Sequence, residues 1–312
     1  MSRSLLRRLY TTAPQSPSPS PSPSASQIAA QFLSHAQSRP PHTQTHLLDG
    51  AQLHRLSATL SRTEFRSTPP NGTKIPPAWH LVYFTPAQLE EELGLDGTDT
   101  TYNAPHPFTR RMWAGGELEW VNAEGLEVGQ TVKETTRLVE ASAKTTRTGE
   151  EMIVVGVRKE FENERGVVLV DKRNWIFRPP ITTPLAPVAP TNFVPISDAH
   201  HYRDYIQSPV TLFRFSALTF NAHKIHYNRE WCREVEGHRD LVVHGPLNLV
   251  HMVDLWRDMN GRWPRRVTYR NTKPVYVGER YRILMDEERG AGTECRLVDD
   301  FGGLGMVGRV EG

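Results

Sequence analysis

Hydrophobic residues occupy nearly every turn of the segment from about Pro246 to Met259, which predicts a helix buried on almost all sides. Only a narrow polar stripe interrupts this segment, through Asn248, His251, Asp254 and Asp258. Such a helix must be wrapped by other elements, and four strand-like stretches follow it to the C-terminus. We therefore expect a sheet that curls around this one helix.

Strand-like stretches also fill the region from Trp79 to Arg178. Their sequences are HLVYF, GELEW, TVKETTRLVEASAKTT, EMIVVGVRKEFEN and GVVLVDKRNWIF. Between the first two, residues 85–88 (TPAQ) combine a cap residue, a proline at the first helical position and a capping-box glutamine. They predict a short helix that ends near Gly94. Farther along, TLFRFSALTF predicts a strand, and NAHKIHYNREWCREV predicts a turn followed by a helix.

These patterns predict an α+β protein built from two related halves. The second half, residues 201–312, has the composition of a hot-dog fold, in which an antiparallel sheet wraps a central helix. The first half, residues 47–178, has similar strand content but no equally apolar helix, so we expect a degenerate copy and a double hot-dog overall. Residues 179–200 are proline-rich and carry little charge, which favours an ordered strap between the halves.

The first 46 residues differ from the rest of the chain. Residues 1–14, MSRSLLRRLYTTAP, are rich in Arg, Ser and Leu, and no acidic residue precedes Asp49, which is typical of a mitochondrial transit peptide. The alternative is a short basic tail that has no targeting function. Residues 16–25, SPSPSPSPSA, predict a disordered linker because alternate residues are prolines. We expect ordered structure to begin near Leu47, and the protein to lie in the mitochondrial matrix.

Composition argues against several classes of protein. The 312 residues carry a formal net charge of +2, but removing the four arginines of the first 48 residues leaves 33 basic residues against 35 acidic ones. We therefore expect no nucleic-acid partner. Two cysteines, Cys232 and Cys295, are too few for a disulfide framework and favour a reducing compartment. No apolar run approaches the roughly 20 residues of a membrane helix, so we expect no membrane span.

Seven of the thirteen histidines fall between His200 and His251. His223 and His226 have the His-x-x-His spacing that on a helix would let two imidazoles share a metal ion. No third ligand is evident and no carboxylate-histidine motif accompanies them. Core or surface histidines are therefore the favoured interpretation, and we expect no metal site.

The buried helix opens with His244, Gly245 and Pro246. Glycine and proline at a helix start leave backbone N–H groups unpaired, with the positive end of the helix dipole behind them. This arrangement can bind an anion or stabilise an oxyanion. The alternative is a plain helix N-terminus with proline at its usual first position.

Two runs in the C-terminal half resemble the MaoC-like hot-dog hydratases. FRFSALTFNAHKIHYN, followed by LVVHGPLNLV, is similar to the family pattern S-G-D-x-N-P-x-H and a later helix that opens with H-G. In the N-terminal half, HLVYFTPAQLEEELGLDG and PFTRRMWAGGELEW resemble the mitochondrial hydroxyacyl-thioester dehydratase type 2 proteins and the related mesaconyl- and itaconyl-type CoA hydratases. The resemblance covers most of residues 75–310.

The resemblance implies roles for individual residues. His226 corresponds to the family's catalytic histidine, and Gly245 to the glycine whose N–H polarises the thioester carbonyl. Asn221 occupies the place of the catalytic aspartate. Because an amide can neither accept nor return a proton, Asn221 is expected to orient the hydroxyl or water. His223 and His244 are expected to stand beside these residues.

The resemblance also implies an activity. It points to a hydro-lyase of mitochondrial fatty acid synthesis that reversibly dehydrates (3R)-3-hydroxyacyl thioesters to trans-2-enoyl thioesters without a metal or redox cofactor. His226 would handle the C2 proton and protonate the departing hydroxyl, while the Gly245 N–H stabilises the enolate-like oxygen. One alternative is a hydratase of a short dicarboxylic acyl-CoA of the mesaconyl or itaconyl type. The other is a non-catalytic thioester-binding protein.

The acyl group would be carried on CoA or on the phosphopantetheine of mitochondrial acyl carrier protein. Basic residues that could meet the carrier's phosphates follow the buried helix, at Arg262, Arg265, Arg266 and Lys273. Arg110 and Arg111 form a second candidate pair, with salt bridges between the halves as the alternative. Gly115 and Gly116 more plausibly serve close strand packing. Two fused halves would supply the pairing that single hot-dog units obtain by dimerising, so we expect a monomer.

Overall fold

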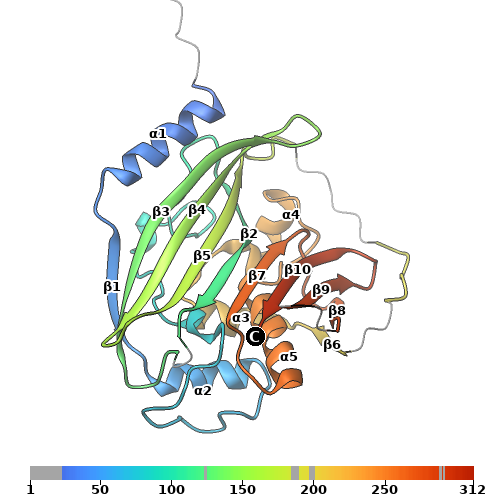
Figure 1. Cartoon of the computed structure of the whole chain (residues 1–312). Coiled ribbons are helices and arrows are strands. Elements are labelled where there is room, and N and C mark those ends of the chain that lie inside the picture. Colours follow the sequence, from blue (N-terminus) through green and yellow to red (C-terminus); the bar gives the residue numbers. More distant parts are fainter. Residues whose placement is uncertain (1–22, 123–124, 184–189, 197–200, 288–289, 291) are drawn as a thin grey trace, which may run out of the picture.

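The computed structural model describes residues 23–122, 125–183, 190–196, 201–287, 290 and 292–312. Within them, ten strands form one continuous sheet in which all neighbours are antiparallel. The strand order is β1-β3-β4-β5-β2-β7-β10-β9-β8-β6. The first five strands of the chain form one half of the sheet and the last five form the other (Figure 1). This arrangement confirms the predicted α+β double hot-dog.

The strands are β1 (His42–Leu47), β2 (Arg110–Trp120), β3 (Thr131–Thr145), β4 (Glu151–Asn163), β5 (Gly166–Arg178), β6 (His201–Ile206), β7 (Arg266–Asn271), β8 (Arg280–Met285), β9 (Thr293–Asp299) and β10 (Leu304–Glu311). The α-helices are α1 (Ala25–Gln37), α2 (Gly50–Thr59), α3 (Pro209–Leu218), α4 (Arg229–Glu234) and α5 (Gly245–Asn260). The 3-10 turns are η1 (Trp79–Val82), η2 (Glu90–Glu92) and η3 (Lys224–His226).

Helix α5 is the predicted buried helix. All of its residues from 247 to 256 are buried, and it lies against β6, β7, β8 and β10. The polar stripe of this helix has hydrogen-bond partners inside the protein. Asn248 accepts a hydrogen bond from Tyr281 Oη at 2.9 Å, and His251 lies 3.1 Å from the Gln207 amide. Gly261 ends the helix in the left-handed conformation, with φ of 61°.

The two halves join edge to edge between β2 and β7. Gly115 pairs with Arg270, and Gly116 pairs with Tyr269. A Cβ at Gly116 would lie 2.0 Å from the Lys172 carbonyl oxygen, and one at Gly115 would lie 2.4 Å from the Tyr269 carbonyl oxygen. Only glycine permits this approach, so the expectation that these glycines serve strand packing is confirmed.

The N-terminal half has a polar belt in place of a long central helix. On β3, β4 and β5 the belt residues lie between two apolar clusters, so that Lys159 separates Phe161 of one cluster from Val157 of the other. The belt consists of His80, Glu134, Lys159, Asp171 and Arg173. Within it, Lys159 pairs with Glu134 at 2.8 Å, and Asp171 pairs with both Arg173 and His80.

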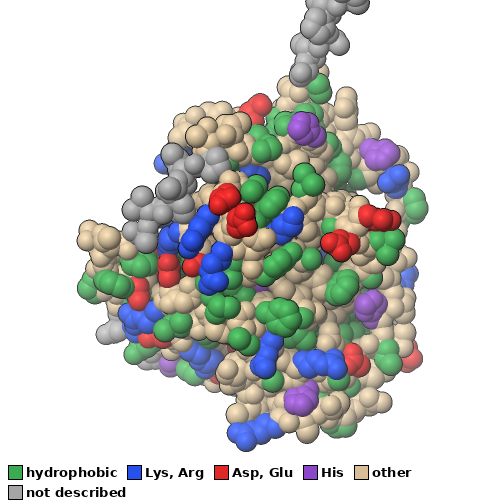
Figure 2. Space-filling view, turned by 180° about the vertical axis from the view of Figure 1, so that it is seen from behind, with side chains coloured by type: hydrophobic (Ala, Val, Ile, Leu, Met, Phe, Trp, Pro, Cys, Tyr) green, Lys and Arg blue, Asp and Glu red, His purple; other side chains and the backbone are tan. Residues whose placement is uncertain are grey.

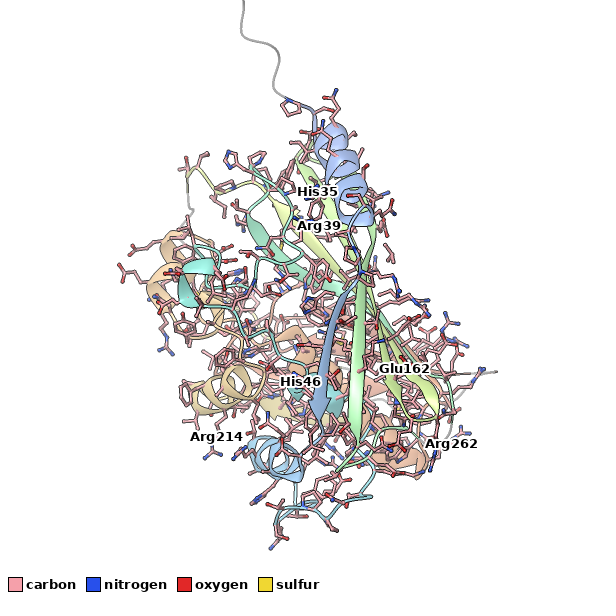
Figure 3. The ribbon with its side chains drawn as sticks, turned by 90° about the vertical axis from the view of Figure 1, so that its left-hand side faces the viewer. His35, Arg39, His46, Glu162, Arg214 and Arg262 are labelled. Carbon is pink, nitrogen blue, oxygen red and sulfur yellow. The ribbon has the colours of Figure 1, made fainter. Side chains whose placement is uncertain are left out.

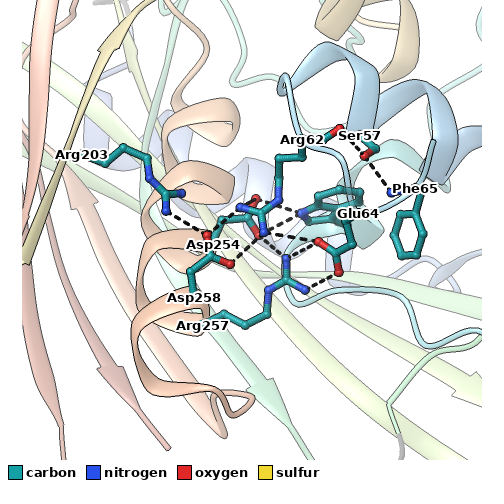
Figure 4. A network of polar contacts seen from close by, with 9 residues as sticks. Ser57, Arg62, Glu64, Phe65, Arg203, Asp254, Arg257 and Asp258 are labelled. Carbon is teal, nitrogen blue, oxygen red and sulfur yellow. Dashed lines mark hydrogen bonds and ion pairs between the residues drawn. The ribbon is translucent and has the colours of Figure 1, made fainter.

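Ion pairs fasten the loop after α2 to the C-terminal end of α5 (Figure 4). Arg62 binds Asp258 through two hydrogen bonds of 2.8 Å, and Arg257 binds Glu64 through two of 2.7 Å. Asp254 accepts the indole N–H of Trp79 at 3.2 Å. A surface pocket lined by these charges therefore lies at the opposite end of α5 from His244.

Three local predictions are wrong. TLFRFSALTF belongs to helix α3, because Leu212, Phe215 and Leu218 bury one helical face and Ser208 caps the start. HLVYF is not a strand, since its first residues form the buried turn η1. The helix predicted after Thr85 is only the 3-10 turn η2.

Ordered structure also begins earlier than Leu47. Helix α1 starts with a capping box between Ser24 and Gln27 and packs on β3, and β1 pairs with β3. The predicted transit peptide, residues 1–14, and most of the predicted linker, residues 16–25, lie outside the described part of the chain. Residues 184–189 and 197–200 of the predicted strap also lie outside it.

Candidate active site

Two imidazole rings stack at the start of α5. His226 ends the η3 turn, and His244 is the N-cap residue of α5. Their ring centroids are 3.5 Å apart, with 18° between the planes. The N–H of Val242 donates to the Ile225 carbonyl at 2.9 Å and holds the two segments together. The structure thus places His226 directly beside the helix start.

Burial and hydrogen bonding make His226 a neutral base. Its Nδ1 lies 2.8 Å from the carbonyl oxygen of Val242. Because a carbonyl can only accept, Nδ1 carries the hydrogen and Nε2 keeps its lone pair. Burial lowers the pKa of His226 to about 4, although the hydrogen bond to Val242 opposes this shift. The ring is therefore uncharged at neutral pH, as a general base must be.

His244 leaves the helix start uncapped. Its Nε2 lies 2.9 Å from Ser216 Oγ, and its side chain accepts no N–H of α5. Burial, reinforced by the positive charges that His226 and His223 would carry if protonated, lowers the pKa of His244 well below its ordinary value. The first N–H groups of a helix have no acceptor within the helix, so the first turn of α5 presents donors suited to a developing oxyanion.

Gly245 carries the first of these N–H groups. A Cβ at this position would lie 2.9 Å from Asn271 Nδ2 and 3.5 Å from the Trp113 ring. Asn271 Nδ2 donates to the Trp113 carbonyl at 2.9 Å, and Trp113 Nε1 donates to Tyr269 Oη at 3.2 Å. Residues of both halves therefore line the helix start.

Asn221 and His223 lie in the turn between α3 and η3. Phe220 adopts the left-handed conformation with φ of 47°, and the Asn221 N–H donates to the Ser216 carbonyl at 2.9 Å. Asn221 Oδ1 accepts the backbone N–H of His223 at 3.2 Å. The Nδ2 hydrogens of Asn221 thus remain as donors for a hydroxyl or a water.

A carboxylate from the N-terminal half also reaches the histidines, and the sequence analysis missed it. Asp96 Oδ2 lies 3.5 Å from His223 Nε2, and the two residues are only 6% and 7% exposed. Neither atom has a hydrogen-bond partner within the described residues. The available signal was Gly94 and Gly97 on either side of Asp96, which indicates a tight turn but not what the turn faces.

Arg110 and Arg111 have different surroundings. Arg110 binds Glu236 of the C-terminal half at 2.9 Å, which is the salt bridge between halves that sequence analysis offered as the alternative to phosphate binding. Arg111 donates to the Asp99 carbonyl at 2.9 Å and to Asn103 Oδ1 at 3.3 Å, and its guanidinium stands 4.4 Å from the centre of a tryptophan ring. Burial lowers the pKa of Arg111. No ion pair joins Arg111 to a carboxylate of the described residues.

The structure does not bring the arginines after α5 to the histidines. Arg262 follows the C-terminal end of α5 (Figure 3), and Gly245 begins this helix of 16 residues, which is about 24 Å long at 1.5 Å per residue. Arg265 lies 3.5 Å from Glu311, and Arg266 pairs with Glu117. Lys273 is exposed in the loop after β7, the strand whose last residue contacts Gly245. Lys273 therefore remains the candidate phosphate contact on the histidine side.

The sequence analysis also made predictions about metal sites, membrane spans and surface charge. Across the residues that the structure describes, no group of three or more His, Cys, Asp and Glu side chains is arranged to hold a metal ion. None of the described helices is long and apolar enough to cross a membrane. Figure 2, which views the molecule from behind, shows basic and acidic side chains interspersed over that face.

The chain is similar in sequence to a known protein family and to individual enzymes. The family model described as hydroxyacyl-thioester dehydratase type 2 matches residues 78–277. The mesaconyl-C(4)-CoA hydratase of Chloroflexus aurantiacus is 31% identical over 223 residues, covering 69% of this chain and 78% of that protein. The mitochondrial hydroxyacyl-thioester dehydratase type 2 of Schizosaccharomyces pombe is 25% identical, covering 77% of this chain and 88% of that protein.

A solved structure agrees on the fold. The MaoC-like dehydratase of Phytophthora capsici superposes with a TM-score of 0.65 at 14% identity. The match covers 88% of this chain and 96% of that one. The likeness therefore extends over both halves of the sheet.

Proposed function

The chain belongs to the hydroxyacyl-thioester dehydratase type 2 family, and from this premise we propose that it reversibly dehydrates (3R)-3-hydroxyacyl thioesters to trans-2-enoyl thioesters. The observation that carries this proposal is the stack of His226 on His244. It brings a neutral imidazole to the uncapped N–H groups of α5, so that one acyl group can meet both a base and an oxyanion donor.

The proposed reaction begins at C2 of the acyl group. His226 Nε2 takes the C2 proton while the Gly245 N–H stabilises the negative charge that develops on the thioester oxygen. Losing one such donor costs roughly 2.7 to 4 kcal/mol in comparable sites. Asn221 Nδ2 donates to the hydroxyl on C3 and keeps it in place. In the simplest scheme the His226 imidazolium then protonates that hydroxyl, which leaves as water.

The same proposal covers the carrier of the acyl group, the cellular compartment and the oligomeric state of the protein. The acyl group is carried on CoA or on acyl carrier protein, and the reaction needs no metal or redox cofactor because it moves only a proton and water. The relatives of Schizosaccharomyces pombe and Saccharomyces cerevisiae are both named mitochondrial, which supports a mitochondrial location. We further propose the matrix as the compartment and fatty acid synthesis as the role. The joined halves favour a monomer.

Hydration of trans-2-enoyl-CoA tests the proposal. The full chain is mixed with crotonyl-CoA and longer homologues, and the absorbance of the conjugated thioester is followed. We expect His226→Ala to lower kcat about 10²- to 10⁴-fold, as loss of a general base does. The matched control is His251→Ala, which removes a buried histidine about two turns farther along α5. A parent chain inactive on these substrates and on fumaryl-CoA would leave only the non-catalytic, thioester-binding alternative.

Arg111 supports a second candidate function, hydration of a short dicarboxylic acyl-CoA. The hydrogen bonds of the Arg111 guanidinium go only to neutral oxygens, although the carboxylates of Asp99 and Asp96 are near enough to raise its pKa against the effect of burial. Such a buried guanidinium favours a negative charge in direct contact, and Arg111 is close enough to lower the pKa of His223. A relative named mesaconyl-C(4)-CoA hydratase supports the same reading. Fumaryl-CoA and crotonyl-CoA differ only by a carboxylate in place of a methyl group. A preference for fumaryl-CoA that Arg111→Gln abolishes and Arg110→Gln retains would establish this function.

A further inference from the structure

Asp96 is a charged residue at the site for which the mechanism above has no use. Its Oδ1 accepts the N–H and the hydroxyl of Thr98 at 3.0 and 2.8 Å, so one face of the carboxylate is fixed. Its own carbonyl accepts the N–H of Lys224 at 2.7 Å. The backbone at Gly97 lies so close to Ala222 that a Cβ would come within 2.1 Å of its carbonyl oxygen. The loop is thereby held against the turn that carries His223.

This packing points the free oxygen of the carboxylate at His223. Asp96 Oδ2 and His223 Nε2 are 3.5 Å apart, both buried and both without another partner among the described residues. Buried polar atoms are rarely left unpaired without a functional reason. The His223 ring lies 5.4 Å from the His226 ring, with 83° between the planes. This separation suits two bases that address neighbouring carbons of one substrate.

His223 needs such a partner to act as an acid. Burial, the charge of Arg111 and the charges that His226 and His238 would carry lower the pKa of His223 well below its ordinary value. On its own, the ring would be neutral and would have no proton to give to a departing hydroxyl. The Asp96 carboxylate, 3.5 Å away, supplies an opposite charge, which favours the imidazolium form of a neighbouring histidine.

We propose that Asp96 is a positioning residue that acts on the reacting oxygen through His223. This inference rests on the proposed function. His226 Nε2 takes the C2 proton, and the electron pair of that C–H bond forms the C2–C3 double bond. The C3–O bond breaks, and the hydroxyl leaves as water with a proton from His223. A proton then passes from His226 back to the His223–Asp96 pair, so the enzyme is unchanged after each turnover.

The proposal explains how a chain with an amide at position 221 keeps a proton donor. The carboxylate that the family pattern has at that position is supplied here by the other half of the double hot-dog. Asn221 retains the task of holding the hydroxyl. The carboxylate contacts His223 instead, and both halves contribute to one acid–base site.

A carboxylate swap tests this proposal. The variants Asp96→Asn, Asn221→Asp and the two combined are assayed on crotonyl-CoA. We expect Asp96→Asn to lower kcat at least about 100-fold with less than about a threefold change in KM, because only proton transfer is affected. The double variant should regain at least about tenfold in kcat, because position 221 then supplies an acid. The matched control is Asp99→Asn, which alters a similar carboxylate that caps Thr101 on the surface of the same loop.

Two results would overturn the proposal. The first is a kcat for Asp96→Asn within about threefold of the parent. The second is a large loss that Asn221→Asp does not repair, which would mean that Asp96 only shapes its loop. If Asp96→Asn does not fold, Thr98→Val replaces it, since it removes the hydroxyl that aims the carboxylate. An unchanged kcat in that variant would also overturn the proposal, whereas an inactive parent would instead reject the proposed function.

Discussion

Acidification is the perturbation that most directly tests the neutral base at His226. The ring is buried, its Nδ1 is bound to the Val242 carbonyl, and its pKa is lowered to about 4. At pH 5.5 a histidine with an ordinary pKa of about 6.5 would be about 9% neutral, whereas a pKa of about 4 leaves about 97% neutral. The fraction of neutral, active imidazole therefore differs about tenfold between the two cases. We therefore expect no fall in kcat/KM from pH 7.5 to 5.5.

The assay measures kcat/KM for hydration of crotonyl-CoA in buffers of constant ionic strength. This quantity reports the ionisation of the free enzyme, which is the state that the structure describes. Tryptophan fluorescence at each pH shows whether the chain is still folded, because Trp79 and Trp256 are fully buried. Returning each sample to pH 7.5 must restore its rate.

A fall of about tenfold in kcat/KM by pH 5.5, with unchanged fluorescence, would refute the reasoning about His226. If the fluorescence changes below pH 6, the comparison of pH 7.5 with pH 6.5 decides instead. An ordinary histidine would lose nearly half of its neutral form over that interval, whereas a base with a pKa of about 4 would lose almost none.

Three further predictions follow from the same contacts. Gly245→Ala should lower kcat at least about tenfold, because its Cβ would displace the Asn271 amide beside the oxyanion donor; parental kcat in the enoyl-CoA assay would contradict this. Arg110→Gln should cost about 2 kcal/mol of stability by leaving the buried Glu236 unpaired, and calorimetry should show a Tm about 4 °C lower. Stability should also fall on acidification. The folded pKa of His251, about 3, lies below the unfolded value of about 6.5, so protonation of His251 alone costs about 2 kcal/mol of stability between pH 7.5 and 5. An unchanged urea midpoint would contradict this.

The sequence was most informative where the burial of a helix or strand produces a local pattern of hydrophobic residues. The apolar run from Pro246 to Met259 predicted helix α5, whose bounds are Gly245–Asn260. Alternating residues predicted the long strands of the N-terminal half. A ten-residue apolar run, by contrast, fits a strand and a buried helix equally well, which is why α3 was predicted as a strand. Its cap at Ser208, just before the run, distinguished the two.

Motifs also located His226 and Gly245, because the residues that form the helix start are close together in the chain. The surroundings of these residues were decided elsewhere. Trp113 reaches Gly245 from β2, and Asp96 reaches His223 from a loop more than a hundred positions earlier. The strand pairing between the two halves brings these segments to one place.

The amino-acid sequence by itself therefore determined the long strands of the N-terminal half, which helix is buried and which histidine stands at its start. Only the tertiary structure decided that Asp96 faces His223 and that Arg262 lies at the far end of α5. It also decided that Arg110 pairs across the halves, while Arg111 forms no ion pair with a carboxylate in the part of the chain that the structure describes. The reason is physical. Local patterns record whether a side chain is buried, whereas the identity of its neighbour depends on how distant segments pack, and no short stretch of sequence encodes that.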